Sequence, residues 1–205
     1  MATKSLLLVE GNDELHVLSH LLKHHQLPDN FSIKDKKGIE NLLETLDAEL
    51  DAGGLERLGV IVDADTAPTS RWQSLRSIFG QAGCPLPDQA DPLGIVVELS
   101  GRALTRVGVW VMPDNEAEGM LEDFVRSLVP PEDALLIFAE ECVDEVIARD
   151  CRFRPSYRSK ALIHTWLSWQ KEPGTPLGLA IRNHELDAGA AYALPLMSWL
   201  RRMFD

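Results

Sequence analysis

Hydrophobic residues follow two patterns along the first 112 positions of the chain: short continuous runs, and longer stretches in which they recur every three or four residues. Continuous runs are typical of strands buried on both faces, and the longer period is typical of helices that pack by one face. The runs predict strands at residues 6–9, 31–34, 58–62, 94–99 and 106–112. The periodic stretches predict helices at residues 12–27, 38–53 and 69–79.

The last two predicted strands are separated by a short segment that contains Ser100 and Gly101. This segment is too short for a helical crossover and predicts an antiparallel hairpin. From Gly119 onward the pattern is helical, with helices expected at residues 120–129, 132–149, 159–170 and 191–204.

Strands and helices that alternate first, with helices alone at the end, predict an α/β fold. We expect a mostly parallel, Rossmann-like sheet flanked by helices, followed by a helical C-terminal part. Residues 1–128 would form the α/β domain, and residues 129–205 would form a helical extension packed on the same domain.

Composition places the chain among globular proteins, because 205 residues with 45% hydrophobic content are enough to bury a sizeable core. No apolar run approaches the roughly 18 residues needed to cross a bilayer, and the N-terminus lacks a cationic segment followed by an apolar one. We therefore expect a soluble, cytoplasmic protein that does not associate with membranes.

Charge argues against a protein that coats nucleic acid through bulk electrostatics, since the net charge is -12. One segment, Arg149–Lys171, has the opposite balance. It contains a single acid, Asp150, and six basic residues, which are Arg149, Arg152, Arg154, Arg158, Lys160 and Lys171. This basic strip either binds the phosphates of a nucleic acid or is a solvated helix face with its connecting loop.

Three carboxylates stand where predicted strands end. Glu10 follows the first strand, and Asp63 and Asp65 follow the third. Ligands of open α/β sheets collect at the carboxyl ends of the strands, so these acids would meet at one edge if the two strands are neighbours. Carboxylates held close together repel one another, and a divalent cation such as Mg²⁺ (or Mn²⁺) removes that repulsion. The sequence thus predicts a metal site formed by Glu10, Asp63 and Asp65.

Short motifs around these acids resemble those of the Toprim domain, which is found in topoisomerases, bacterial primases and OLD-family nucleases. The motifs are VEG at Val9–Gly11 and DAD at Asp63–Asp65, and they lie within the first 125 residues or so. With VMPDN at Val111–Asn115 and GMLEDF at Gly119–Phe124, the chain looks like small stand-alone bacterial Toprim-related proteins of unknown function. The resemblance implies Mg²⁺-dependent phosphodiester hydrolysis or phosphoryl transfer on nucleic acid, with Glu10, Asp63 and Asp65 as metal ligands.

Further roles follow from likeness to OLD-type nucleases, in which a second acid lies about one helical turn after the first and a lysine lies near the end of the domain. Glu14 would then permit a second metal ion, and Lys160 would neutralise the transition-state phosphate. Glu122 follows the last strand and is a further candidate ligand. We also expect Gly11 to let the backbone turn tightly beside the ion.

The chain departs from the topoisomerase pattern, because Ala67 occupies the position of a third aspartate, and neither a nucleophilic tyrosine in a recognisable context nor an ATPase P-loop is present. A non-catalytic module that binds a metal, a nucleotide or nucleic acid therefore stays open as an alternative. A haloacid-dehalogenase-type phosphatase is disfavoured, because it would leave Glu10 without a role. A partner protein or self-association is compatible with either function. His16, His20 and His24 share a helical face, where solvation or packing is favoured over metal binding.

Overall fold

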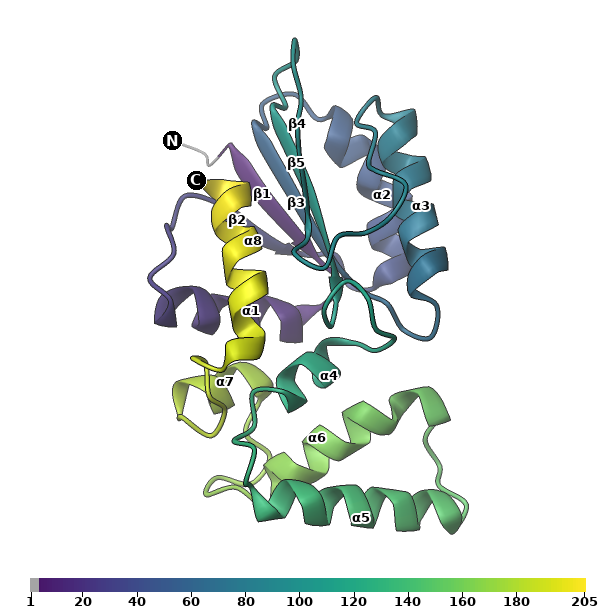
Figure 1. The fold of residues 1–205 in the computed structure, drawn as a ribbon, viewed down its shortest axis with the longest axis vertical. Helices are drawn as coiled ribbons and strands as arrows, with labels where there is room; N and C mark the ends of the chain where they lie inside the picture. The colour runs from purple at the N-terminus through teal and green to yellow at the C-terminus, as the bar shows by residue number, and fades with distance from the viewer. Residues whose placement is uncertain (1–3) are drawn as a thin grey trace.

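The computed structural model describes residues 4–205 and shows an α/β fold built on a five-stranded sheet (Figure 1). The strands are β1 (Ser5–Val9), β2 (Ser32–Asp35), β3 (Arg57–Asp63), β4 (Ile95–Glu98) and β5 (Arg106–Met112), in the order β2-β1-β3-β5-β4. All pairs are parallel except β4–β5, which is antiparallel at one edge. The five predicted strands and the predicted hairpin are confirmed.

Helices cover both faces of the sheet. On one face lie α2 (Ile39–Asp51) and α3 (Pro68–Gln81), and on the other lie α1 (Asn12–His24) and α8 (Leu194–Phe204). Leu7 and Val9 belong to the hydrophobic cluster beneath α1 and α8, whereas Leu8 belongs to the cluster beneath α2 and α3. Because alternate residues of a strand point to opposite faces, this double cover explains why β1 is a continuous apolar run.

The remaining helices lie beyond the carboxyl ends of the parallel strands. They are α4 (Leu121–Arg126), α5 (Ala134–Ala148), α6 (Arg158–Ser168) and α7 (Leu177–Arg182), with short 3₁₀ turns η1 (Pro155–Tyr157) and η2 (Ala191–Ala193). The sequence did not predict α7, which spans only six residues. The helix expected at residues 120–129 is shorter than predicted and ends at Arg126.

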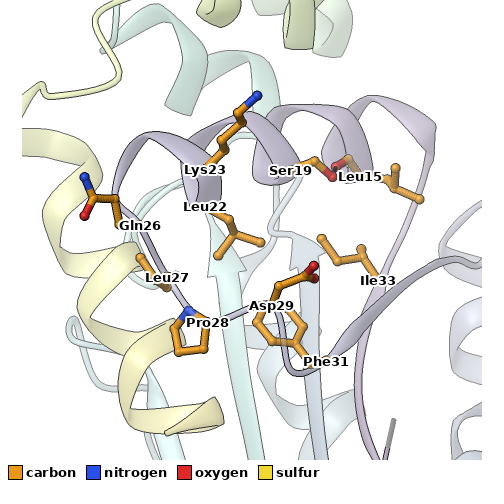
Figure 2. A pocket seen from close by; sticks show the side chains of 10 residues that line it. All are labelled: Leu15, Ser19, Leu22, Lys23, Gln26, Leu27, Pro28, Asp29, Phe31 and Ile33. Atoms are coloured by element: carbon orange, nitrogen blue, oxygen red, sulfur yellow. Dashed lines mark hydrogen bonds between the residues drawn. The ribbon is translucent and has the colours of Figure 1, made fainter. Parts of the chain in front are cut away.

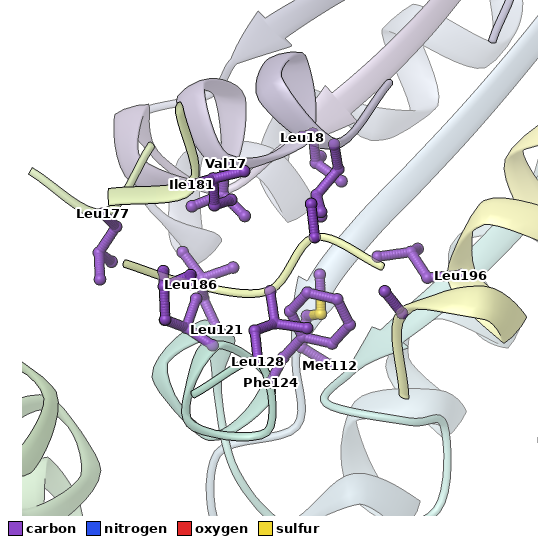
Figure 3. Packing of buried hydrophobic residues seen from close by; sticks show 14 of the residues in the cluster. Val17, Leu18, Met112, Leu121, Phe124, Leu128, Leu177, Ile181, Leu186 and Leu196 are labelled. Carbon is purple, nitrogen blue, oxygen red and sulfur yellow. The ribbon is translucent and has the colours of Figure 1, made fainter. Parts of the chain in front are cut away.

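The C-terminal helices share a hydrophobic core with the sheet (Figure 3). Phe124 of α4, Ile181 of α7 and Leu196 of α8 pack around Leu18 of α1 and Met112 at the end of β5. In contrast, α5 buries only Ala139 and Val143 and lies far from the sheet. The packing of α4 on this core fixes the segment that faces the ends of β1 and β3.

Candidate active site at the acidic edge of the sheet

The carboxyl ends of β1 and β3 bring Glu10 and Asp63 into contact. The two strands are parallel neighbours, Glu10 follows β1 directly, and Asp63 is the last residue of β3. The backbone N–H of Asp63 donates a hydrogen bond of 2.7 Å to Oε1 of Glu10. The register of the sheet therefore places the two carboxylates as the sequence led us to expect.

A backbone latch joins the loop after β3 to the loop before α4. Asp65 and Gly119 exchange two N–H···O hydrogen bonds of 2.8 Å, and Asp65 adopts a left-handed backbone with φ of 54°. The N–H of Leu121 then donates to Oδ1 of Asp63 at 3.0 Å. These contacts hold the start of α4 against the end of β3, so that Glu122 lies in the site with only 3% of its surface exposed.

Glu14 reaches the same place from the first turn of α1, where it is 9% exposed. Gly11 lies in a bend that precedes this turn, but its backbone is extended with φ of −145°, so the bend does not depend on the conformational freedom of glycine. A Cβ at this position would instead lie 3.0 Å from Oε2 of Glu14. A larger residue here would press on the Glu14 carboxylate and shift it within the cavity.

The acids line a single cavity of about 490 Å³. Its lining residues are Glu10, Gly11, Asn12, Asp13, Glu14, Gly38, Asp63, Asp65, Met120, Leu121, Glu122, Tyr157 and Lys160. All six residues named from the sequence, which are Glu10, Glu14, Asp63, Asp65, Glu122 and Lys160, thus line one cavity. The structure brings them together from β1, α1, β3, α4 and α6 with the loops that follow the strands.

Two side-chain cations balance part of this negative charge. Nζ of Lys160 lies 3.1 Å from Oε1 of Glu122. Arg71 of α3 donates to Oδ2 of Asp65 at 2.7 Å and to the backbone oxygen of Asp63 at 2.9 Å. The sequence analysis missed Arg71, although its place in the first turn of the helix after Asp63 was a usable signal, since that turn leaves from the same edge of the sheet.

The pKa values of Glu10, Glu14 and Asp63 are raised because burial and mutual repulsion disfavour the charged forms. Burial raises the pKa of Glu10 to about 7, against the partial compensation of the Asp63 N–H and the Arg71 charge. Burial, followed by the charges of Glu10, Glu14 and Glu122, raises the pKa of Asp63 well above its usual value. Burial also raises the pKa of Glu14, and the charge of Glu122 adds to that effect. The cavity is therefore short of positive charge.

The cavity contains more carboxylates than cationic side chains, and carboxylate oxygens are hard ligands. A divalent ion such as Mg²⁺ therefore fits the cavity in both ligand chemistry and charge. Within residues 4–205, however, no group of three or more His, Cys, Asp or Glu side chains is already arranged to hold a metal ion. Glu10 and Asp63 each accept one backbone N–H through one oxygen, and Asp65 and Glu122 each have one oxygen in an ion pair. A carboxylate has two oxygens, so these contacts leave the other oxygen of each group for a cation.

The basic strip is partly neutralised by acids of α5. Arg149 pairs with Glu145, and Arg158 pairs with Asp144. Arg152 and Arg154 are exposed and have no acidic partner in the part of the chain that the structure describes. Part of the positive charge of the basic strip is therefore neutralised within the protein, and the charges of Arg152 and Arg154 remain free to bind an anion.

The histidines of α1 lie away from the acids. His20 and His24 line a separate cavity of about 260 Å³ with Arg182 and His184. Burial, followed by the charge of Arg182, lowers the pKa of His20. A cavity wall that combines imidazoles with Arg182 and Lys23 is a poor environment for a metal cation. His16 packs closely against Gly178 of α7.

A larger cavity of about 590 Å³ lies between α1 and the edge strand β2 (Figure 2). Leu15, Leu22, Leu27, Phe31 and Ile33 supply most of its wall. Its charged groups, Lys23 and Asp29, do not form a cluster of carboxylates. An active site needs reactive side chains as well as space, so the smaller acidic cavity is the stronger candidate for an active site.

Comparisons with known proteins identify a family and find solved structures of limited similarity. The family model "Protein of unknown function (DUF3226)" matches residues 4–205. No curated protein matches the chain. Two solved structures of the C-terminal region of the Xanthomonas campestris pv. campestris OLD protein, phased with mercury and with platinum, are similar at 15% and 14% identity, each with a TM-score of 0.45. The matches cover 98% and 99% of this chain and 96% and 93% of those chains. Within residues 4–205, no helix has the length and apolar character that crossing a membrane requires.

Proposed function

The chain belongs to the family "Protein of unknown function (DUF3226)", and for this member we propose a Toprim-type nuclease or phosphotransferase that depends on Mg²⁺ or Mn²⁺ and acts on nucleic acid. The observation that carries the proposal is the crowding of buried carboxylates around the contact between Glu10 and Asp63. Such crowding destabilises a metal-free fold, and a divalent cation relieves it. The Toprim-like motifs of the sequence support the same chemistry.

We assign Glu10, Asp63 and Asp65 as ligands of the catalytic ion, with Glu14 and Glu122 able to contribute to a second ion. When bound, the ion supplies Lewis-acid polarisation of the phosphate and neutralises its developing charge. The backbone N–H of Leu121 orients the Asp63 carboxylate, and the N–H of Asp63 orients that of Glu10. These contacts hold the two carboxylates rigidly at the strand ends, as a preorganised site requires.

Two side chains are placed to move protons or neutralise charge. With an ion bound, Glu10 would be ionised, and its oxygen that does not bind the ion would accept the proton of the attacking water. The P–O bond to the leaving oxygen then breaks, and solvent protonates that oxygen. The Lys160 side chain is 48% exposed at the cavity and would neutralise the phosphate by moving from Glu122.

A second candidate function is a module that binds a metal, a nucleotide or nucleic acid without turnover. The observation in its favour is that Lys160 and Arg71 are paired with Glu122 and Asp65, so neither cation is free for a transition-state phosphate. The phosphatase alternative is weaker. Such an enzyme would use an aspartate at the end of β3 as its nucleophile, and Glu10, which contacts Asp63 there, would have no role.

A cleavage assay distinguishes these functions. End-labelled single-stranded and duplex DNA and RNA are incubated with the protein and Mg²⁺, Mn²⁺ or EDTA. We expect metal-dependent cleavage that is lost in Asp63→Asn, whose amide oxygen can still accept from the Leu121 N–H. Glu44→Gln, at an exposed acid of α2, is the matched control and should cleave normally. Equal cleavage by Asp63→Asn, or saturable Mn²⁺ binding without any product, would refute catalysis at this site.

A further inference from the structure

Tyr157 is an aromatic side chain at the acidic cavity that the proposed chemistry leaves without a role. It ends the 3₁₀ turn η1, immediately before α6, and lines the cavity together with Lys160. Its side chain is not buried in the core, because 44% of the residue is exposed. An exposed aromatic ring beside a phosphodiester site offers a surface on which a base can stack.

A second cavity of about 200 Å³ adjoins the acidic one and extends it past η1. The two cavities share Asp65 and Met120 as lining residues. The wall of the second cavity includes Pro155 and Ser156, which form η1 with Tyr157. Both cavities therefore border the same turn, so a strand whose phosphate enters the acidic cavity can continue along it.

Positive charge for such a strand is available on the segment that leads into η1. Lys160 and Arg71 are already bound to Glu122 and Asp65. In residues 4–205, Arg152 and Arg154 have no acidic partner, are exposed, and lie on the segment that leads into η1. Because a polyanion is repelled by the crowded carboxylates, these arginines would attract the phosphates that flank the reacting one.

We propose that the site acts on single-stranded nucleic acid, with an unpaired base stacked on Tyr157 and the neighbouring phosphates held by Arg152 and Arg154. The inference rests on the proposed function and names its substrate class. In a duplex each base is paired and stacked between its neighbours, so its face is not free for Tyr157 unless it leaves the stack. A single strand meets no such barrier, and an aromatic ring with adjacent arginines is the combination that binds single strands without reading their sequence.

Binding is measured by fluorescence anisotropy in EDTA, so that no cleavage intervenes. The probes are end-labelled 12-mers: oligo(dT), oligo(rU), an abasic deoxyribose-phosphate strand of the same charge, and a mixed-sequence DNA duplex. We expect tight binding to oligo(dT) or oligo(rU), and the difference between these two probes identifies DNA or RNA as the preferred strand. Tyr157→Leu should weaken that binding at least about fivefold, and Tyr157→Trp should restore it.

The abasic strand separates stacking from charge. Its affinity should not change in Tyr157→Leu, whereas Arg154→Gln should weaken binding of abasic and natural strands alike and reduce the slope of log K against log salt by about 0.7. Arg182→Gln, an exposed arginine of α7, is the charge-matched control and should leave the slope unchanged. Thermal unfolding of each variant checks that the fold is intact.

The inference is overturned if oligo(dT) and oligo(rU) fail to bind, if the duplex binds more tightly, or if Tyr157→Leu weakens the abasic strand as much as the natural one. Failure of the proposed function has a different signature. If the protein binds single strands through Tyr157 but yields no product with Mg²⁺ or Mn²⁺, the inferred ligand class stands and the proposed catalysis is wrong.

Discussion

Replacing Glu10 by Gln should stabilise the metal-free protein while removing its response to metal. The amide oxygen of Gln can still accept the hydrogen bond that the Asp63 N–H donates to Glu10. The substitution therefore removes a charge with little change in shape. If the carboxylates are crowded as the structure shows, loss of one charge relieves repulsion on the others.

The magnitude follows from the pKa of Glu10, which burial raises from 4.5 to about 7. A raised carboxyl pKa means that the folded state binds the proton more tightly than the unfolded state does. The free energy of unfolding of the wild type therefore falls as pH rises from the unfolded pKa through the folded one. The fall amounts to at most about 3 kcal/mol, and about 1 kcal/mol of it lies between pH 6 and pH 8.5.

Urea denaturation in EDTA at pH 6 and pH 8.5 tests this prediction, and both values lie above the sequence pI of about 4.9. The gain of Glu10→Gln over wild type should grow by about 1 kcal/mol between the two pH values. Added Mg²⁺ should stabilise the wild type more than the variant. Glu44→Gln should stay within about 0.5 kcal/mol of wild type at both. A variant less stable than wild type at pH 8.5, or a gain independent of pH, would refute the reasoning.

Three other substitutions test individual contacts. Lys160→Met leaves the buried Glu122 carboxylate without its cation and should lower the free energy of unfolding by about 1–2 kcal/mol. Adding Glu122→Gln to the same chain should restore most of this loss, as a double-mutant cycle would measure. Gly11→Ala places a Cβ 3.0 Å from Oε2 of Glu14 and should weaken Mn²⁺ binding by calorimetry, while thermal unfolding changes little. Gly108→Ala places a Cβ 2.8 Å from a backbone oxygen of β4 and should lower the unfolding free energy by about 1–3 kcal/mol in urea; an unchanged midpoint would contradict the packing of β5.

The meeting of Glu10 and Asp63 was predictable from sequence because it depends on a regular element. Parallel strands share a direction, so acids that directly follow two neighbouring strands must lie at one edge of the sheet. The apolar runs predicted β1 and β3, and their connection through two helices and an edge strand fits their pairing as neighbours. Glu14 was named from the likeness to OLD-type nucleases, and the first turn of α1, which leaves from that edge, explains its place.

Other parts of the site depend on contacts between distant segments and left no local pattern. The latch between Asp65 and Gly119 joins loops that are 54 positions apart, and the chain passes through β4 and β5 between them. The ion pair of Lys160 with Glu122 depends on how α6 packs on α4. Tyr157 belongs to a three-residue turn that is too short to show a period. Such features require the tertiary arrangement, since neither propensity nor hydrophobic period encodes them.

The pairing of Lys160 with Glu122 should link binding of the proposed nucleic acid to binding of the proposed cation. The Lys160 side chain is 48% exposed, whereas that of Glu122 is 4% exposed, so Lys160 is free to move toward a phosphate and Glu122 is not free to follow it. Movement of Lys160 alone would leave a buried carboxylate uncompensated, which is strongly unfavourable. A divalent cation beside Glu122 removes that penalty, so each ligand should strengthen binding of the other.

Anisotropy titrations of oligo(dT) with and without Ca²⁺, with the probe checked for cleavage afterwards, measure this coupling. We expect Ca²⁺ to tighten binding about fivefold or more in the wild type. Any tightening that survives in Lys160→Met reports only the general relief of repulsion by the cation, and it should be clearly smaller. Equal tightening in both proteins would show that Lys160 stays on Glu122 when nucleic acid binds, and the proposed role of Lys160 in neutralising the phosphate would then be wrong.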